Sequence, residues 1–541
     1  MNRLLRAGTI VLLVVGVAAC SSRFESFAFQ TAEGTHVQIW QSGRVARDQE
    51  ARFTPTAGHI ASPVYRLDKP ALSAPGQAFA VSYTSSVPTC TLTLFSDKNK
   101  VLKSVTLPAT SGNALRFLVS LETGSRLWGY QFSAPKDAAQ GTLAMTGTGT
   151  SAYVHGFLIG ANELTVDGSV EVASASAGVV SARIPAATRD EMASGIWCIT
   201  LLPQEGAAGA RIVFSDAEGR KASYDVNPAS TPARLDFARG SIPFLPTSID
   251  YAGTLAGLSI SRIGADAPLP ADPGLILTWD RSTWRKPDFE LFSWSRFPQV
   301  LILDTASYEL QDALFKRLAF YVEKSGHAGK IESQAALSGL HGYNAHDYRA
   351  EDLARFFTAA TAGGLSAEEG TLEKLLVANG IITKSASGYA PGEGSILSLS
   401  RSSAPLLRDL LLTHECFHGA YFSLPAFRDA TEALWTSLSD VERQVWLDYL
   451  GSHAYDISDH YLVVNEFQSY LMQQERIGIW GFQDRTLAGM REAGGKSAHL
   501  ARQLASSRPM SFLKSFDALD EALQSAGGPP GGHAISVRLV E

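Results

Sequence analysis

Residues 395–420, SILSLSRSSAPLLRDLLLTHECFHGA, decide the fold of the C-terminal half of the chain. The first six of them predict a short strand with Leu397 and Leu399 on one face. Ser402 or Ser403 can cap a following helix, and Pro405 suits the first turn of that helix. The sequence therefore predicts a strand that leads directly into a helix, as part of an α+β domain.

A second strand and further helices are predicted around this stretch, from about residue 285 onward. Residues 300–303 form an uninterrupted apolar run that is typical of a buried strand. Ser366 with Glu369, and Ser439 with Glu442, match the capping-box pattern that begins a helix. Periodic apolar spacing predicts other helices at about 310–321 and 351–360 and a last long helix at about 459–476, and residues 535–540 fit one final strand with no assigned neighbour.

Residues from about 25 to 275 follow a different pattern, because short alternating runs recur and glycine, proline, serine and aspartate separate them. Phe79, Val81 and Tyr83 alternate with smaller or polar residues, as in a half-buried strand. Spacing of this kind is typical of β-sandwich domains. We therefore expect this half of the chain to be all-β.

Three landmarks indicate a duplication within the β-rich half. The triplet Phe95-Ser96-Asp97 recurs as Phe214-Ser215-Asp216, Pro108-Ala109-Thr110 recurs as Pro228-Ala229-Ser230, and Phe117 recurs as Phe237, at offsets of 119, 120 and 120 residues. A period of this length indicates a duplicated domain, since solenoid units are much shorter; chance similarity between β-rich segments is the alternative. The predicted fold is multidomain, with two tandem all-β sandwich-like domains at 20–160 and 161–280 and an α+β domain at 281–541.

The first 20 residues have the layout of a secretory signal. Arg3 and Arg6 precede an apolar core that is too short to span a bilayer comfortably, and small residues follow it up to Cys20. This segment resembles the bacterial lipoprotein signal, which implies a signal peptide at 1–19, cleavage before Cys20 and a lipid on the Cys20 thiol. Ser21, in place of aspartate, then implies the outer membrane of a two-membrane cell envelope; an ordinary signal peptide is the alternative.

Charge, hydropathy and cysteine content bear on the partners, the membrane attachment and the disulfides of this protein. The net charge is −7 and the basic residues form no cluster, which argues against a nucleic-acid partner. No later stretch is long and apolar enough for a transmembrane helix, so we expect the lipid on Cys20 to be the membrane anchor. Cys90 and Cys198 could form a disulfide in an exported protein, but the sequence leaves their pairing open. Cys416 is interpreted as a small buried residue.

His414, Glu415 and His418 carry the chemistry that the sequence predicts. Residues four apart on a helix project from the same face, so both imidazoles can bind one Zn²⁺. Glu415 lies one step around the helix, where it can reach a water on the metal. The pattern resembles the HExxH motif of the zincin metallopeptidases, in which an edge strand binds extended substrates. The alternative is two hydrogen-bonded or solvent-facing histidines on an amphipathic helix.

A catalytic zinc normally has three protein ligands, and Glu466 is the favoured third one. It lies on a predicted apolar helix, where an unpaired carboxylate is costly. The segment Asn465-Glu466 resembles the gluzincin branch, whose third ligand is a glutamate on a later helix, although the separation of 48 residues from His418 is longer than in the best-known gluzincins. The other candidates for the third ligand are His453, Asp456, Asp459 and His460.

The resemblance also implies a hydrolytic mechanism. Glu415 acts as the catalytic base and passes its proton to the leaving amine. Tyr470 lies one helical turn beyond Glu466 and is one candidate to stabilise the developing oxyanion. The other candidate donors are Tyr455, His453 and His460.

A second polar and aromatic cluster lies at residues 341–349. It suits the wall of a pocket. It equally suits a loop at the start of a helix, with Asn344 or Asp347 as the cap.

The predicted function is a membrane-anchored, extracytoplasmic zinc metallopeptidase with peptide or protein substrates. The C-terminal domain is then zincin-like, and the two β-domains serve as stalk or docking modules. Two other hypotheses stand beside this one: a non-catalytic binding or adhesin-like lipoprotein with a zincin-like domain, and a zinc hydrolase that acts on a non-peptide bond. Glu415 argues against the first of these, because a purely structural zinc site has no use for it.

Overall fold

The computed structural model describes residues 52–540 with interruptions, and it describes 255–540 without a gap. The undescribed positions within that span are 54–63, 73–77, 86–88, 98–99, 109–114, 121–124, 135–142, 152–154, 161–162, 167–170, 177–178, 185, 204–209 and 254. The predicted signal peptide and Cys20 lie outside the described residues. The chain divides into two compact units, one of residues up to 154 with 160–167, and one of 155–159 with 168–541.

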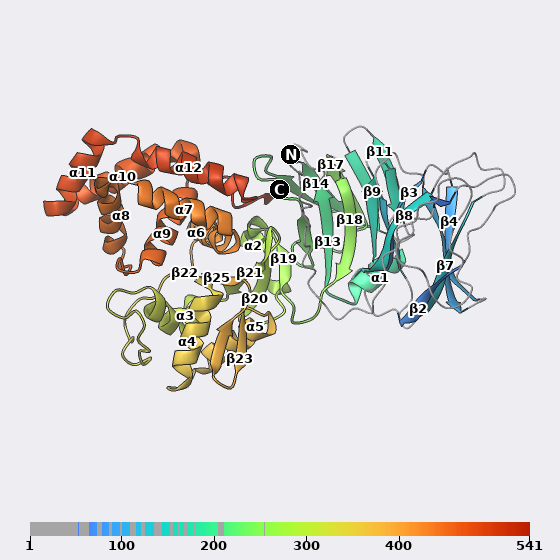
Figure 1. Ribbon diagram of the computed structural model, residues 1–541, viewed down its shortest axis with the longest axis horizontal. Helices are drawn as coiled ribbons and strands as arrows, with labels where there is room; N and C mark the ends of the chain where they lie inside the picture. Colours follow the sequence, from blue (N-terminus) through green and yellow to red (C-terminus); the bar gives the residue numbers. More distant parts are fainter. Residues whose placement is uncertain are drawn as a thin grey trace, which may run out of the picture. The chain divides into compact units, whose positions relative to one another are not determined.

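Several β-sheets form the N-terminal region, and the C-terminal region is mainly helical (Figure 1). In the first unit, one sheet has the strand order β2-β7-β4-β5 and another has the order β1-β8-β3-β6. Cys90, Leu92 and Leu94 are buried at alternate positions of β4, as a strand with one apolar face requires. The strands of this unit are β1 (Arg52–Phe53), β2 (Tyr65–Leu72), β3 (Ala78–Ser85), β4 (Thr89–Asp97), β5 (Lys100–Pro108), β6 (Leu115–Ser120), β7 (Arg126–Ser133), β8 (Leu143–Ser151) and β10 (Glu163–Val166).

The second unit begins with two further sheets that pack against each other. One has the order β11-β12-β17-β14-β15-β26, and the other contains the run β9-β18-β13-β16. Phe214 and Tyr224 of the first sheet meet Phe237 of the second edge to face, at ring-centroid distances of 5.0 and 5.1 Å. The elements are β9 (His155–Gly160), β11 (Glu171–Ser176), β12 (Val179–Arg183), helix α1 (Ala186–Ala193), β13 (Trp197–Pro203), β14 (Arg211–Ser215), β15 (Lys221–Val226), β16 (Leu235–Ala238), β17 (Ser248–Ala252) and β18 (Leu255–Arg262).

The two β-regions have the same strand order. The run β2-β7-β4-β5 corresponds to β12-β17-β14-β15, and the run β8-β3-β6 corresponds to β18-β13-β16. Two of the predicted landmarks fall on equivalent strands, with Phe95 on β4 and Phe214 on β14, and with Phe117 on β6 and Phe237 on β16. Phe95 pairs with residue 129 and Phe214 with residue 249, so the cross-strand register agrees as well. This agreement is what a duplication requires.

The second β-region continues into the C-terminal half through one of its sheets. β16 pairs with β19 (Leu269–Ala271), and the order goes on through β20 (Phe289–Trp294), β21 (Phe297–Thr305) and β25 (Ser395–Ser400) to β22 (Ala345–Arg349). β25 runs parallel to β21, whereas β22 is antiparallel to β25 and ends the sheet. The boundary predicted at 280/281 therefore falls inside a continuous sheet.

The end of the chain returns to the other sheet of the second β-region. β26 (Val537–Val540) pairs with β15, which gives the predicted strand at 535–540 its neighbour. The buried Asp272 carboxylate accepts hydrogen bonds from Ser536 N, Val537 N and Gly274 N at 2.9–3.1 Å. Asp272 therefore joins the start of α2 (Pro273–Thr278) to β26.

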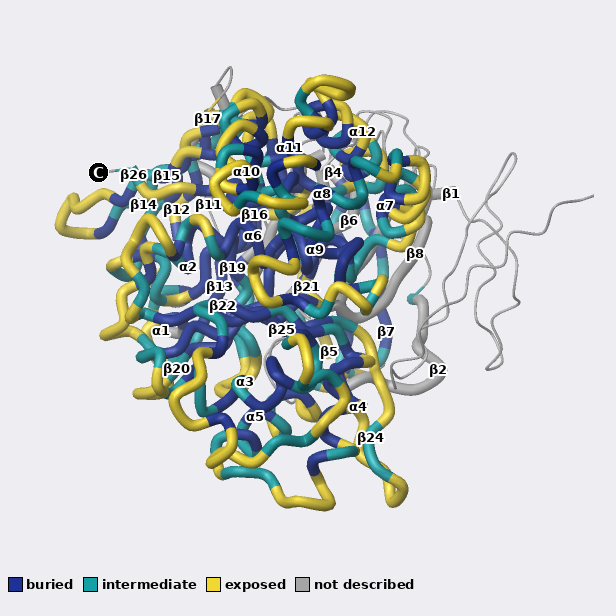
Figure 2. The backbone as a smooth tube through the Cα atoms, turned by 90° about the vertical axis from the view of Figure 1, so that its left-hand side faces the viewer, coloured by how far each residue is buried: buried dark blue, intermediate teal, exposed yellow. Residues whose placement is uncertain are grey.

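Helices cover both faces of the continued sheet. Leu301, Leu303 and Ile396 belong to a core with α3 (Tyr308–Val322), α4 (Ala350–Thr361) and α5 (Ala367–Ala378), whereas the alternate residues of β21 and β25 face α6. Figure 2 shows mostly buried backbone where α6 and α9 lie. The other elements are β23 (Ile382–Ser385), β24 (Gly388–Pro391), α6 (Pro405–Ser423), α7 (Pro425–Ser437), α8 (Asp440–Ser452), α9 (His460–Met472), α10 (Ile479–Ala493), α11 (Gly495–Ser507) and α12 (Ser511–Ser525), with short 3-10 helices at Arg281–Thr283 and Arg476–Gly478.

Most local predictions for the C-terminal half are confirmed. Strands occur at 300–303 and 395–400, capping boxes begin α5 and α8, and Pro405 is the first residue of α6. The predicted cap of α6 is wrong: Ala404 is the cap, and Ser402 Oγ instead accepts a hydrogen bond from Tyr308 N. The helix predicted at about 459–476 is confirmed as α9, but it ends earlier, at Met472, and it is not the last helix, because α10, α11 and α12 follow. No described helix is both long and apolar enough to cross a bilayer.

Candidate metal centre

Helix α6 approaches the sheet closely at the position that follows the two histidines. A Cβ atom on Gly419 would lie 3.0 Å from Val300 Cγ1 and 3.5 Å from Leu397 Cδ1. Glycine at 419 therefore lets α6 pack tightly against β21 and β25. This packing buries the second half of α6 between the sheet and α9.

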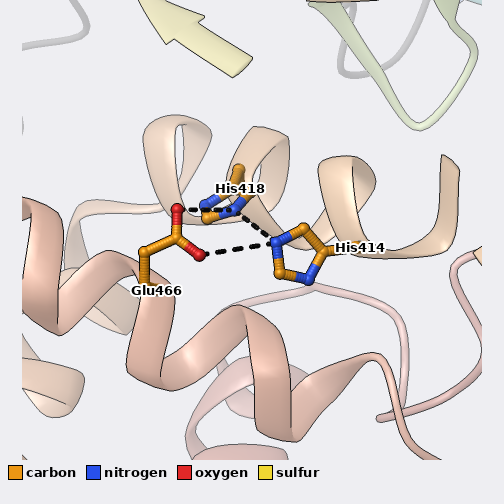
Figure 3. A group of neighbouring side chains, drawn as sticks. All are labelled: His414, His418 and Glu466. Atoms are coloured by element: carbon orange, nitrogen blue, oxygen red, sulfur yellow. Dashed lines mark hydrogen bonds and ion pairs between the residues drawn. The ribbon is translucent and has the colours of Figure 1, made fainter. Parts of the chain in front are cut away.

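Three side chains from α6 and α9 meet in this buried region (Figure 3). His414 Nε2 and His418 Nε2 lie 3.0 Å apart. Glu466 Oε2 is 3.5 Å from His414 Nε2, and Glu466 Oε1 is 3.6 Å from His418 Nε2. Two ligands at zinc–nitrogen distances of 2.0–2.1 Å and a tetrahedral angle lie about 3.3 Å apart, so the three groups have the spacing of ligands around one ion.

The second nitrogen of each imidazole has a hydrogen-bond partner. His414 Nδ1 lies 3.0 Å from Gln473 Oε1, which can only accept, so Nδ1 carries the proton. His418 Nδ1 lies 3.0 Å from Ser469 Oγ and 3.4 Å from Asp347 Oδ2. Partners of this kind orient metal-binding histidines and fix their tautomer. Both Nε2 atoms are then left to present a lone pair to the same point.

The chemistry of this donor set fits a cation. His414, His418, Glu415 and Glu466 are 0–8% exposed, so water does not solvate their polar atoms well. Two facing lone pairs and a carboxylate repel one another when they are desolvated. Glu466 Oε2 and Glu415 Oε2 are buried and have no hydrogen-bond partner among the described residues. A cation bound where the three side chains converge would remove this repulsion.

Glu415 lies beside the three ligands, in a second group with Asp347 and His418. Burial, followed by repulsion from Glu466 and Glu323, raises the pKa of Glu415 well above its usual range. Burial, followed by repulsion from Glu415, has the same effect on the pKa of Asp347. Burial alone would raise the pKa of Glu466, but His418 and His414 hold it below its ordinary value. The site thus gathers more carboxyl groups than can be ionised together in a buried position.

Tyrosines form one wall of the site. The Tyr470 ring lies edge-on to His414 at a centroid distance of 4.8 Å. Burial raises the pKa values of Tyr455 and Tyr470. Each therefore stays a neutral donor.

The other sequence candidates lie outside the group of three. His453 follows α8 and its Nδ1 contacts Tyr449 O, and Asp456 accepts hydrogen bonds from Ser458 in the next turn. Asp459 caps α9, and His460 forms an exposed ion pair with Glu432 at 2.7 Å. Among the candidates for a third ligand, the structure brings only Glu466 to the histidines.

The cluster at 341–349 reaches the histidines through Asp347, and Tyr343 stacks on Tyr455 at a ring-centroid distance of 5.6 Å. Residues 345–349 form β22, and Arg349 precedes α4 as its cap residue, so the interpretation of Asn344 or Asp347 as a cap is wrong. Asp347 instead faces His418. Sequence reasoning did not assign Asp347, Ser469, Gln473 or Glu323 to the site. Ser469 and Gln473 lie three and seven residues after Glu466, which is a helical spacing that could have found them.

The described cysteines are buried free thiols. Cys90 lies in the first unit and Cys198 in the second, and each is a free thiol in the structure. Cys416 is fully buried, in agreement with its interpretation as a core residue.

Comparison with known proteins identifies no relative. No family model matches the chain, and no curated protein or solved structure matches it.

Proposed function

We propose that this protein is a zinc metallopeptidase whose C-terminal region is zincin-like and of the gluzincin type. One observation carries the proposal: His414 Nε2, His418 Nε2 and the Glu466 carboxylate converge, while the opposite nitrogen of each imidazole has its own hydrogen-bond partner. A zinc ion held there would act as a Lewis acid on the scissile carbonyl and would activate water.

The residues around that point have separate roles in the proposal. Glu415 accepts a proton from the attacking water and donates it to the leaving amine, from a buried position beside His418. Asp347 and Gln473 hold the imidazoles in place. Tyr470 is the proposed hydrogen-bond donor to the developing oxyanion, because its ring already contacts His414.

The sheet offers a place for the substrate backbone. β22 ends the strand order and carries Asp347 beside His418. An extended peptide could pair with the outer side of β22, as substrates pair with the edge strand in zincins. The support is positional: the strand at the end of the sheet is also the strand that reaches the site.

The remaining parts of the proposal concern anchoring and architecture. The two β-regions are proposed to be duplicated sandwiches that hold the peptidase region away from an outer membrane, to which Cys20 is joined by lipid. Cys20→Ser should release the protein from membranes, because a thiol-linked lipid provides its stable attachment. Unchanged membrane partitioning of that variant would refute the anchor.

The catalytic proposal is tested with Glu415→Gln and Glu466→Ala. Glu415→Gln removes the base but no ligand, so zinc content should stay at the parental level while hydrolysis of a mixed peptide library falls by roughly 10²–10⁴-fold. Glu466→Ala removes a ligand, so zinc affinity and hydrolysis should fall together. A parent protein that binds zinc and cleaves nothing would instead support the non-catalytic binding lipoprotein. Full zinc content and full activity in Glu466→Ala would remove Glu466 from the ligand set.

A further inference from the structure

A cavity of about 610 Å³ lies among α8, α10 and α11, close to the metal centre. Tyr449 and His453 line it, and their rings lie 5.2 and 6.0 Å from the Tyr470 ring. The Tyr470 ring in turn lies 4.8 Å from that of His414. One aromatic side chain therefore separates the cavity wall from a proposed zinc ligand.

The cavity carries more positive than negative charge. Arg485 of α10 and Lys496 of α11 line it, against the single carboxylate of Asp448. Neither cation has a carboxylate within 4.0 Å among the described residues, and Lys496 Nζ donates only to the neutral Gln444 Oε1, at 3.3 Å.

We propose that this cavity is an anionic subsite that binds a carboxylate of the substrate. The proposal rests on the proposed peptidase function and names the substrate class: peptides with an acidic side chain or a free C-terminal carboxylate near the scissile bond. The ring-to-ring path from His414 through Tyr470 to Tyr449 comprises steps of 4.8 and 5.2 Å. Two ring contacts thus connect His414 to the wall of the cavity.

Two substitutions test the cavity by independent means. Arg485→Gln removes one cation, and Arg491→Gln is its control, since Arg491 is an exposed residue of the same helix that does not line the cavity. Gly489→Phe fills the cavity, because a Cβ atom on Gly489 meets no atom within 4 Å. Gly370→Phe is its control, since Gly370 lies on α5 with the same open space.

Binding is measured on the full chain carrying Glu415→Gln, so that no peptide is consumed. The probes are mixed-sequence peptides in matched pairs: free against amidated C-terminus, and Glu against Gln at one fixed position. We expect roughly 10- to 150-fold tighter binding of the carboxylate member of at least one pair, the range of a charge-assisted hydrogen bond. Arg485→Gln and Gly489→Phe should abolish that preference, and the two controls should keep it. The pair that shows the preference identifies its source as the C-terminus or a side chain.

Equal binding of both members of every pair would overturn the anionic subsite. A preference that survives both Arg485→Gln and Gly489→Phe would also overturn it. These results are independent of the catalytic proposal, because the preference is a binding measurement. If the chain binds no zinc but shows the preference, the subsite is supported and the peptidase proposal is refuted. If the chain cleaves peptides without the preference, the peptidase proposal is supported and the subsite is refuted.

Discussion

The two β-regions have the same strand order and differ in what lies at their edges. In the first region, β5 and β6 are the last strands of their sheets among the described residues. In the second region, the equivalent strands β15 and β16 each have one more neighbour, β26 and β19. Edge strands present unpaired backbone groups to any strand that comes near. The second region satisfies its edges with strands from the C-terminal half of its own chain.

This difference explains how a β-region supports a metal centre. Through β19 the sheet continues to β25 and β22, which both pack against α6. β22 carries Asp347, which lies beside His418. Through β26 the end of the chain is held against the same region. The second β-region and the candidate metal centre therefore belong to one compact unit, whereas the first β-region belongs to the other unit. A defect in the second region should reach the metal centre, and the equivalent defect in the first should not.

The largest effect is expected from Phe214→Ala, and Phe95→Ala, at the equivalent position of the first region, is its control. Both phenylalanines are buried at equivalent positions of β14 and β4. Phe214 contacts Tyr224 and Phe237, so its truncation should cost about 3–5 kcal/mol and lower the denaturant midpoint at which zinc is released. Phe95→Ala should leave that midpoint unchanged. Equal shifts of the midpoint in the two variants would show that the two units do not unfold independently.

A smaller effect is expected from Asp272→Ala, which breaks the link between α2 and β26. Three buried backbone N–H groups lose their acceptor, and we expect a loss of about 2–3 kcal/mol. Hydrogen exchange at residues 537–540 should accelerate, because β26 then detaches from β15. Asp280→Ala is the control, since Asp280 accepts from Ser282 N at an exposed turn. Unchanged protection of β26 in Asp272→Ala would contradict the role given to Asp272.

The smallest effect is expected from Arg538→Ala. Arg538 on β26 pairs with Asp409 on α6 at 3.1 Å, and both side chains are more than a third exposed. Exposed ion pairs contribute about 0–1 kcal/mol, so thermal unfolding should change little. A double-mutant cycle with Asp409→Ala measures the pair directly. A coupling energy well above 1 kcal/mol would mean that this contact, rather than Asp272, fastens β26.

The sequence predicted those parts that depend on neighbouring residues. The capping boxes at Ser366 and Ser439 depend on residues three apart, and the strand at 395–400 leads into α6 as its pattern indicates. His414 and His418 share a face because they lie four apart on a helix. The duplicated strand order was also foreseeable, because the landmark phenylalanines keep their spacing.

Other features depend on contacts between distant residues. β26 pairs with a strand more than 300 residues earlier, and no local pattern specifies that partner. Asp347 reaches His418 only because β22 adds to the end of the sheet. Ser402 suits a helix cap by its chemistry, but its hydroxyl is used by Tyr308 N. The boundary at 280/281 was placed by a change in composition, which does not reveal that β16, β19 and β20 join one sheet.

Zinc content and X-ray absorption of the purified protein test the central claim most directly. We expect one zinc per chain, with two imidazole nitrogens at about 2.0–2.1 Å and a carboxylate in its coordination shell. His418→Ala should remove one imidazole from the spectrum and weaken zinc binding, and His460→Ala, an exposed histidine outside the site, should change neither. A protein that binds no zinc, or a zinc shell that is unaltered in His418→Ala, would contradict the account.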